Sequence, residues 1–290
     1  MPLSSNAHSV GHSPQSTVRA ADSRLRTPPG QLYSALALFL LVLLSFVGAC
    51  SHPDDTWEHV TESGLLRVGM DASFPPFEYI APDGTPAGFD VELARELGKR
   101  LQLEVQIIAN IPYDGLYDAL AIGRVDVVIS ALVVNPQRTA DFAYSAPYFD
   151  AGQVLVFPIP PKAMSAGMAD LAGQRLAVEF GSPGDQEARK WMQRVPGLEV
   201  LHYDTAGEAL EALKRGEADA ALVDHVTAMS TCADGSGFFI VDRPVVSVPY
   251  AVAVRLQSRQ LLRAVNQALA GMQADGTLER LTARWLCSAG

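Results

Sequence analysis

The chain has 290 residues, of which 48% are hydrophobic and 19% are charged, a composition typical of a folded globular protein rather than a disordered one. Its net charge of −10 gives no electrostatic support for a nucleic-acid partner, because neutralising phosphates requires clustered lysines and arginines. The length allows one large domain or two modest ones.

An apolar segment near the N-terminus predicts export. Residues 32–47 are almost wholly apolar, three arginines precede them, and two small residues and then Cys50 follow, a pattern that resembles a bacterial lipobox. The run is short for a bilayer span but suits a signal peptide. We therefore predict a lipoprotein-type signal peptide over 1–49, lipid on Cys50 and a polar tether over 50–62. An uncleaved anchor helix and an ordinary signal peptide with an incidental cysteine remain alternatives.

The remaining cysteines form an even pair. Cleavage before Cys50 removes three arginines and one aspartate, which changes the net charge from −10 to −12 and leaves Cys232 and Cys287. In an oxidising compartment we expect these two to form a disulfide. Closing a loop of about 56 residues would remove on the order of 4 kcal/mol of unfolded-state entropy. Two unpaired thiols are the alternative, since the sequence does not show whether the Cα atoms come within about 7 Å.

Strand-like and helix-like segments alternate from residue 65 onward. Apolar residues recur at helical spacing after Asp90, which we expect to cap that helix. The βαβ order predicts a parallel sheet covered by helices. We predict strands over 65–70, 103–107 and 125–130, and helices over 90–101 and 114–122.

The same order restarts after the proline-rich segment 158–161, which indicates a second α/β lobe. Thr205 and Glu208 form a capping-box pattern at the start of one of its helices. We predict strands over 174–179, 199–203 and 218–223 and a helix over 184–195, then a strand over 250–255 and helices over 261–272 and 278–286.

Four ordered blocks resemble family 3 of the bacterial extracellular solute-binding proteins, which serve ABC importers of polar amino acids. Residues 88–93 (GFDVEL) are similar to the family signature, and residues 71–77 (DASFPPF) to its ligand-contacting first loop. Residues 129–148 and 274–285 resemble later blocks. The match covers about residues 63–286 in order.

The resemblance implies a type II periplasmic-binding-protein fold of the Venus-flytrap kind, with two α/β lobes joined by two hinge strands. Lobe 1 would comprise residues 63–154 and 250–290, and lobe 2 residues 155–249. The hinge strands would lie near 152–157 and 246–252. A ligand would shift an equilibrium between open and closed lobes, because only the closed form contacts it from both sides.

The resemblance also implies a set of ligand-binding residues. Arg138 matches a clamp for the ligand carboxylate, and Asp224 matches an acid that holds the ammonium group. Asp71 matches a position that faces the cationic end of basic ligands. The full set is Asp71, Phe74, Tyr113, Ser130, Ala131, Val133, Arg138, Ser182 and Asp224.

Each of these residues has a simpler interpretation. Arg138 suits a solvated surface arginine, Asp224 a helix cap, and Asp71 a turn cap, while isolated aromatics such as Phe74 and Tyr113 are more often core. Two positions also depart from the family pattern. Val133 replaces a hydroxyl residue, and Pro183 stands where a threonine is usual. The departures leave the identity of the ligand open.

We therefore predict extracytoplasmic binding of a polar amino acid, or a closely related small amine acid, and its delivery to an ABC permease. The protein would be a lipid-anchored monomer without cofactor, metal or catalytic residues. The histidines of the mature chain show no metal-ligand spacing, and no nucleophile elbow or phosphate loop occurs. The alternative is a dehydratase-type enzyme on the same scaffold that acts on a prephenate-like acid, because fold alone does not decide function.

Overall fold

The computed structural model describes residues 56–159, 167–232, 237–241 and 243–287. The predicted signal peptide and Cys50 lie outside these ranges. Within them, no helix combines the length and apolar character that crossing a bilayer requires.

The first sheet combines strands from both ends of the folded chain. Its order is β5-β1-β6-β15-β7, in which β1 pairs in parallel with β5 and β6 while β15 runs antiparallel to β6 and β7. The strands are β1 (Leu65–Gly69), β5 (Glu104–Ile108), β6 (Val127–Val128), β7 (Phe142–Tyr144) and β15 (Ala253–Arg255). A C-terminal strand therefore completes the lobe that the N-terminal strands begin.

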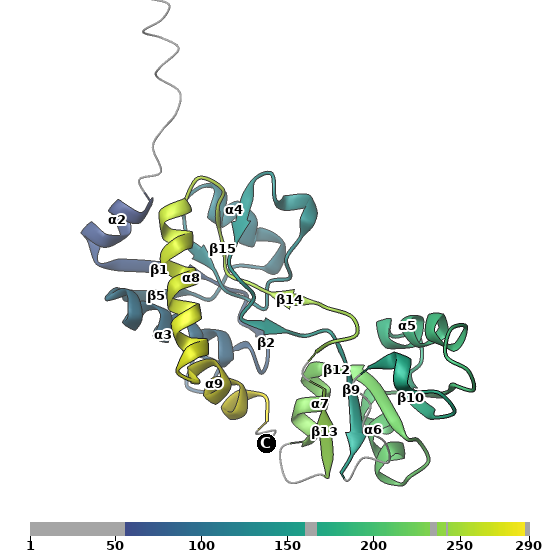
Figure 1. Ribbon diagram of the computed structural model, residues 1–290. Helices are drawn as coiled ribbons and strands as arrows, with labels where there is room; N and C mark the ends of the chain where they lie inside the picture. Colours follow the sequence, from purple (N-terminus) through teal and green to yellow (C-terminus); the bar gives the residue numbers. More distant parts are fainter. Residues whose placement is uncertain (1–55, 160–166, 233–236, 242, 288–290) are drawn as a thin grey trace, which may run out of the picture. The chain divides into compact units, whose positions relative to one another are not determined.

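Helices cover both faces of this sheet. On one face α3 (Phe89–Leu101), α8 (Arg259–Ala274) and α9 (Thr277–Trp285) pack on one another, and Leu93, Leu97 and Leu269 belong to the same buried cluster as Val68 of β1 (Figure 1). On the other face α4 (Leu116–Ala121) buries Leu116 and Leu120 against Val128. The helical spacing of apolar residues in the sequence thus corresponds to real buried faces.

The second sheet has the order β11-β10-β12-β9-β13. Its central strands are buried on both sides, since Val154 and Val156 of β9 join one core cluster and Leu155 and Phe157 join the other. Its strands are β9 (Gln153–Pro158), β10 (Arg175–Glu179), β11 (Glu199–Tyr203), β12 (Ala220–Asp224) and β13 (Phe238–Ile240), and its helices are α5 (Pro183–Met192), α6 (Ala206–Lys214) and α7 (His225–Cys232). The two-lobe α/β organisation is confirmed.

Two hydrogen-bonded segments lead from one sheet to the other. The short strands β8 (Phe149–Asp150) and β14 (Pro249–Tyr250) pair antiparallel, and the pairing continues through a bridge between Gln153 and Val246. At Gly152 a side chain would collide with the carbonyl oxygen of Val246, so glycine is required for this close approach. These segments overlap the predicted hinge strands.

Three local expectations need correction. Residues 56–63, expected largely within the tether, form α2, because Val60 is fully buried and Trp57 packs against the first core. Asp90 does not cap α3: the helix begins one residue earlier, after Gly88, and the Asp90 carboxylate points to other partners.

The third correction concerns the predicted disulfide. Cys287 is a half-buried free thiol, so the bond with Cys232 is not formed. Cys287 follows α9, which packs on α3 and α8, whereas Cys232 ends α7, which packs on strands of the second sheet.

Candidate functional site

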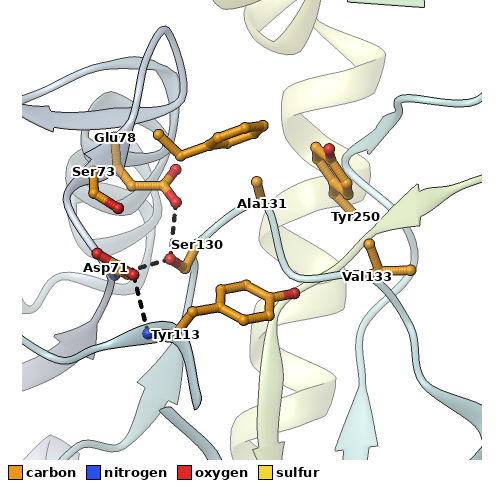
Figure 2. A pocket seen from close by; sticks show the side chains of 9 residues that line it. Asp71, Ser73, Glu78, Tyr113, Ser130, Ala131, Val133 and Tyr250 are labelled. Carbon is orange, nitrogen blue, oxygen red and sulfur yellow. Dashed lines mark hydrogen bonds between the residues drawn. The ribbon is translucent and has the colours of Figure 1, made fainter. Parts of the chain in front are cut away.

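The first lobe contains a cavity of about 330 Å³ (Figure 2). It lies where β1 and β6 end and next to the small sheet of β2 (Ser73–Phe74), β3 (Glu78–Ile80) and β4 (Pro86–Ala87). Its lining residues are Asp71, Ser73, Phe74, Glu78, Tyr113, Ser130, Ala131, Val133 and Tyr250. The carboxyl edge of parallel strands is the usual position of a ligand in α/β sheets.

A chain of hydrogen bonds crosses one wall of this cavity. The Asp71 main-chain N–H donates to Ser130 Oγ at 2.9 Å, and the Ser130 hydroxyl donates to Glu78 Oε1 at 2.8 Å. The Asp71 carboxylate accepts from the main-chain N–H of Tyr113 at 3.0 Å, as Figure 2 shows. Segments far apart in the sequence are thereby held in one wall.

Aromatic rings also line the cavity. Phe74 and Tyr113 are 49% and 46% exposed, although each lines the cavity, so both rings offer a face that a ligand would cover. Phe74 stacks on the fully buried Phe77 with ring centroids 5.8 Å apart, and Phe77 also meets Tyr250 edge to face at 5.3 Å. Buried packing therefore fixes the rings that face the cavity.

Two buried carboxyl groups lie beside the cavity. Glu78 is 1% exposed and Asp90 is completely buried. Burial, and after it the charge of Asp90, raises the pKa of Glu78 to about 10. Burial likewise raises the pKa of Asp90 to about 6, against the hydrogen bonds that it accepts from Ala131 and Tyr148. Both carboxyl groups therefore keep a proton to a higher pH than an exposed acid does.

The structure brings six of the nine predicted residues together. They are Asp71, Phe74, Tyr113, Ser130, Ala131 and Val133, all lining the cavity. The interpretation of Phe74 and Tyr113 as plain core residues does not hold, since each is about half exposed. The binding roles themselves stay predictions.

Arg138 lies elsewhere in the first lobe. It ends the short 3-10 helix Pro136–Arg138, is exposed, and its guanidinium carbon lies 5.0 Å from the ring centroid of Tyr117. It lines a separate hollow with Asp118, Asp141 and Arg255. The structure therefore does not join Arg138 to the cavity, and its clamp role stays a prediction.

Ser182 and Asp224 belong to the second lobe and both cap helices. Ser182 Oγ accepts the N–H of Asp185 at 3.0 Å, at the start of α5. Asp224 Oδ1 accepts the N–H of Thr227 at 2.8 Å, at the start of α7. Because β10 and β12 pair in parallel, both residues follow the carboxyl edge of the second sheet.

Sequence reasoning missed Ser73, Glu78 and Tyr250. Ser73 lies inside the loop 71–77 that carried the resemblance, and Glu78 follows it directly as a single charge between aromatic residues. That isolated charge was a usable signal, because a carboxyl group within an apolar run must either be exposed or have buried partners. Tyr250, more than 100 residues from the others, gave no such signal.

Comparison with known proteins decides the family. The model of the bacterial extracellular solute-binding proteins, family 3, matches residues 66–288, which is most of the chain. The chain belongs to this family. The resemblance read from the four ordered blocks is thus confirmed.

Named relatives of the solute-binding protein are binding proteins. The chain is 32% identical over 227 residues to the L-cystine-binding protein TcyJ of Escherichia coli strain K12. The aligned region covers 78% of this chain and 84% of that protein. The chain is 29% identical to the ABC transporter arginine-binding protein 1 of the same organism, over 76% of this chain and 90% of that one.

A solved structure supports the expected type II fold. An ancestral cyclohexadienyl dehydratase is 26% identical and matches with a TM-score of 0.68, over 79% of this chain and 95% of that chain. That protein is named as an enzyme, but a shared fold does not imply a shared activity. The similarity therefore supports the fold only.

Proposed function

We propose that this solute-binding protein captures a polar amino acid, or a closely related small amine acid, outside the cytoplasm and delivers it to an ABC import permease. The names of its relatives, which bind L-cystine and arginine, support this class of ligand. The cavity of about 330 Å³ also falls within the range of small-molecule sites.

The observation that carries the proposal is an acidic group in the same cavity as two half-exposed aromatic rings. Asp71, Phe74 and Tyr113 line one cavity, and the Asp71 carboxylate accepts a hydrogen bond from the main-chain N–H of Tyr113. Its carboxylate would attract a cationic end, and the ring faces would cover the aliphatic or cationic part of the side chain. We therefore expect ligands with a positive group beyond the α-ammonium to bind best.

The other predicted residues would hold the two ends of the zwitterion. Arg138 offers a planar fork for the carboxylate, and Asp224 in the second lobe would hold the ammonium. The N-terminus of α5 at Ser182 would attract an anionic or hydrogen-bond-accepting group of the ligand. In this proposal a ligand stabilises an arrangement in which both lobes contact it.

A ligand panel tests the proposal. The full-length chain is titrated with the twenty amino acids and L-cystine while its thermal midpoint is followed. At a hundredfold excess over the dissociation constant, the true ligand stabilises the protein by about 2.7 kcal/mol. If no amino acid raises the midpoint, the proposal is wrong.

Asp71→Asn supplies a matched variant for this panel. Removing the charge while keeping the shape should weaken cationic ligands by about tenfold or more and neutral ones much less, because a charged hydrogen bond contributes about 1.5–3 kcal/mol. Equal losses for lysine-like and neutral ligands would contradict a cation-facing role of Asp71.

We propose that the protein performs no chemistry, bears lipid on Cys50 and acts as a monomer. The competing dehydratase function predicts that prephenate is consumed. Incubation with the full-length chain should leave prephenate unchanged. Light scattering should give the molecular mass of a single chain. Conversion of prephenate above the uncatalysed rate would favour the enzyme.

A further inference from the structure

The carboxyl oxygens of Glu78 and Asp90 differ in how they are satisfied. Glu78 Oε1 accepts the Ser130 hydroxyl, and Asp90 Oδ2 accepts both the N–H of Ala131 at 2.5 Å and the hydroxyl of Tyr148 at 2.9 Å. Glu78 Oε2 and Asp90 Oδ1 are buried and have no donor among the described residues. Two orphan acceptors in one buried site are costly unless something supplies a proton.

The two side chains also lie close to each other, since the Asp90 carboxyl raises the pKa of Glu78 and the Glu78 carboxyl lowers that of Asp90. A proton on one carboxyl would make it the missing donor for the other. We propose that Glu78 and Asp90 share one proton between Glu78 Oε2 and Asp90 Oδ1, and that this acid pair positions the Ser130–Ala131 wall of the cavity.

No cation of the described residues is paired with either carboxyl. The titratable groups around the pair are Asp71, whose charge further raises the pKa of Glu78, and Tyr113, Tyr148 and Tyr250. All of these are acids, so ionising both members of the pair would add a second negative charge without compensation. One retained proton relieves that repulsion.

The positioning role follows from what each carboxyl holds. Ala131 lies in the left-handed region with φ of +42°, an uncommon conformation for a residue other than glycine, and the bond to Asp90 fixes its N–H. Glu78 holds the adjacent Ser130, which in turn accepts the N–H of Asp71. The pair thus fixes two adjacent residues of the cavity wall, Ser130 and Ala131.

Infrared difference spectroscopy of the full-length chain at pH 8 tests the shared proton without any ligand. Ordinary carboxyl groups are ionised at this pH, so the C=O band of a protonated carboxyl should come from this pair. We expect the band in the wild type, its loss in Glu78→Gln, and its retention in Glu104→Gln, an exposed control on β5. Absence of the band from the wild type at pH 8 would overturn the proposal.

The pH dependence of stability gives a second, independent reading. Since folding raises the pKa of Glu78 to about 10, the folded state binds a proton that the unfolded state releases, and stability should fall as pH rises from about 5 towards 10. In Glu78→Gln the amide replaces the proton as donor to Asp90, so the thermal midpoint should fall less between pH 6 and 9. Parallel profiles for both proteins would contradict the shared proton.

The positioning role rests on the proposed function and is measured with L-arginine and L-cystine as probes. Glu78→Ala leaves Asp90 Oδ1 without its donor and should weaken binding about tenfold or more, whereas Glu78→Gln should recover at least fivefold of that loss. Equal affinity of Ala and Gln variants would overturn the positioning role. If the wild type binds neither probe, the function proposed above fails for these ligands, while the infrared band still decides the shared proton.

Discussion

At the scale of single residues, Ser130 shows how one small side chain organises the cavity. Its hydroxyl oxygen accepts from the main chain of Asp71 and its proton goes to Glu78, so it uses a donor and an acceptor at once. An alanine there would leave a partly buried N–H and a buried carboxyl oxygen without these partners. The serine is therefore structural support for the site, in addition to any contact with a ligand.

The predicted carboxylate-clamp role of Arg138 can be tested by a single substitution. In the structure it lies over Tyr117 in a separate hollow, while the family resemblance assigns it to the ligand carboxylate. If it is the clamp, Arg138→Ala should lower the affinity for the ligand found in the panel by at least tenfold, with the thermal midpoint of the free protein nearly unchanged, because its side chain is exposed.

The matched control for this measurement is Arg95→Ala, which removes another exposed arginine of the same lobe. Titration calorimetry should give the wild-type dissociation constant for it. Wild-type affinity in Arg138→Ala as well would remove Arg138 from the site.

At the scale of elements, the start of α3 depends on a close approach of two backbone segments. Gly88 has φ of +125°, and a side chain there would collide with the carbonyl of Phe77, next to Glu78. With glycine, the N–H groups of Phe89 and Asp90 reach the carbonyls of Pro76 and Phe77 at 3.0 and 2.8 Å. This approach brings Asp90 next to the cavity wall instead of leaving it as a helix cap.

Thr205 caps α6, as the capping pattern predicted, with its Oγ1 accepting the N–H of Glu208 at 3.1 Å. We expect Thr205→Ala to lower the free energy of unfolding by about 1 kcal/mol, since one helix N–H loses its partner. For a protein of this size the thermal midpoint should fall by roughly 2–4 °C. Thr205→Ser, which keeps the hydroxyl, should stay close to the wild type, and an equal loss in both variants would contradict the capping explanation.

Element boundaries show why the cavity could be predicted only in part. Residues 125–130 are all buried, as the apolar run predicted, yet only Val127–Val128 pair as β6. The apolar run thus predicted burial correctly but did not predict which residues pair in the sheet. The chain leaves β6 after Val128, and Ser130 and Ala131 beyond it line the cavity.

At the scale of the whole molecule, the chain assembles its first lobe from distant segments. β15, near the C-terminus, lies between β6 and β7 in the first sheet, while β9 to β13 build the second. Tyr250 reaches the cavity because it lies on β14, in the segment that returns to the first sheet. A truncation before β15 would therefore remove part of the lobe that contains the cavity.

The proposed lipid anchor is a property of the whole chain. On expression in a bacterium, the wild type should fractionate with membranes, and Cys50→Ser should appear in the soluble extracytoplasmic fraction. Cys287→Ser, which removes a free thiol in the folded part, should remain with the membranes. Membrane association of Cys50→Ser would instead favour an uncleaved anchor helix, and a soluble wild type an ordinary signal peptide.

The sequence by itself determined the α/β alternation, the two lobes and six residues of the cavity, because periodic burial and ordered local blocks are recorded in neighbouring positions. Only the tertiary structure decided that Cys287 is a free thiol, that Arg138 lies apart from the cavity, and that Glu78 lies beside Asp90. Those outcomes depend on which distant segments the packing brings together, and spacing along the chain carries no record of such contacts.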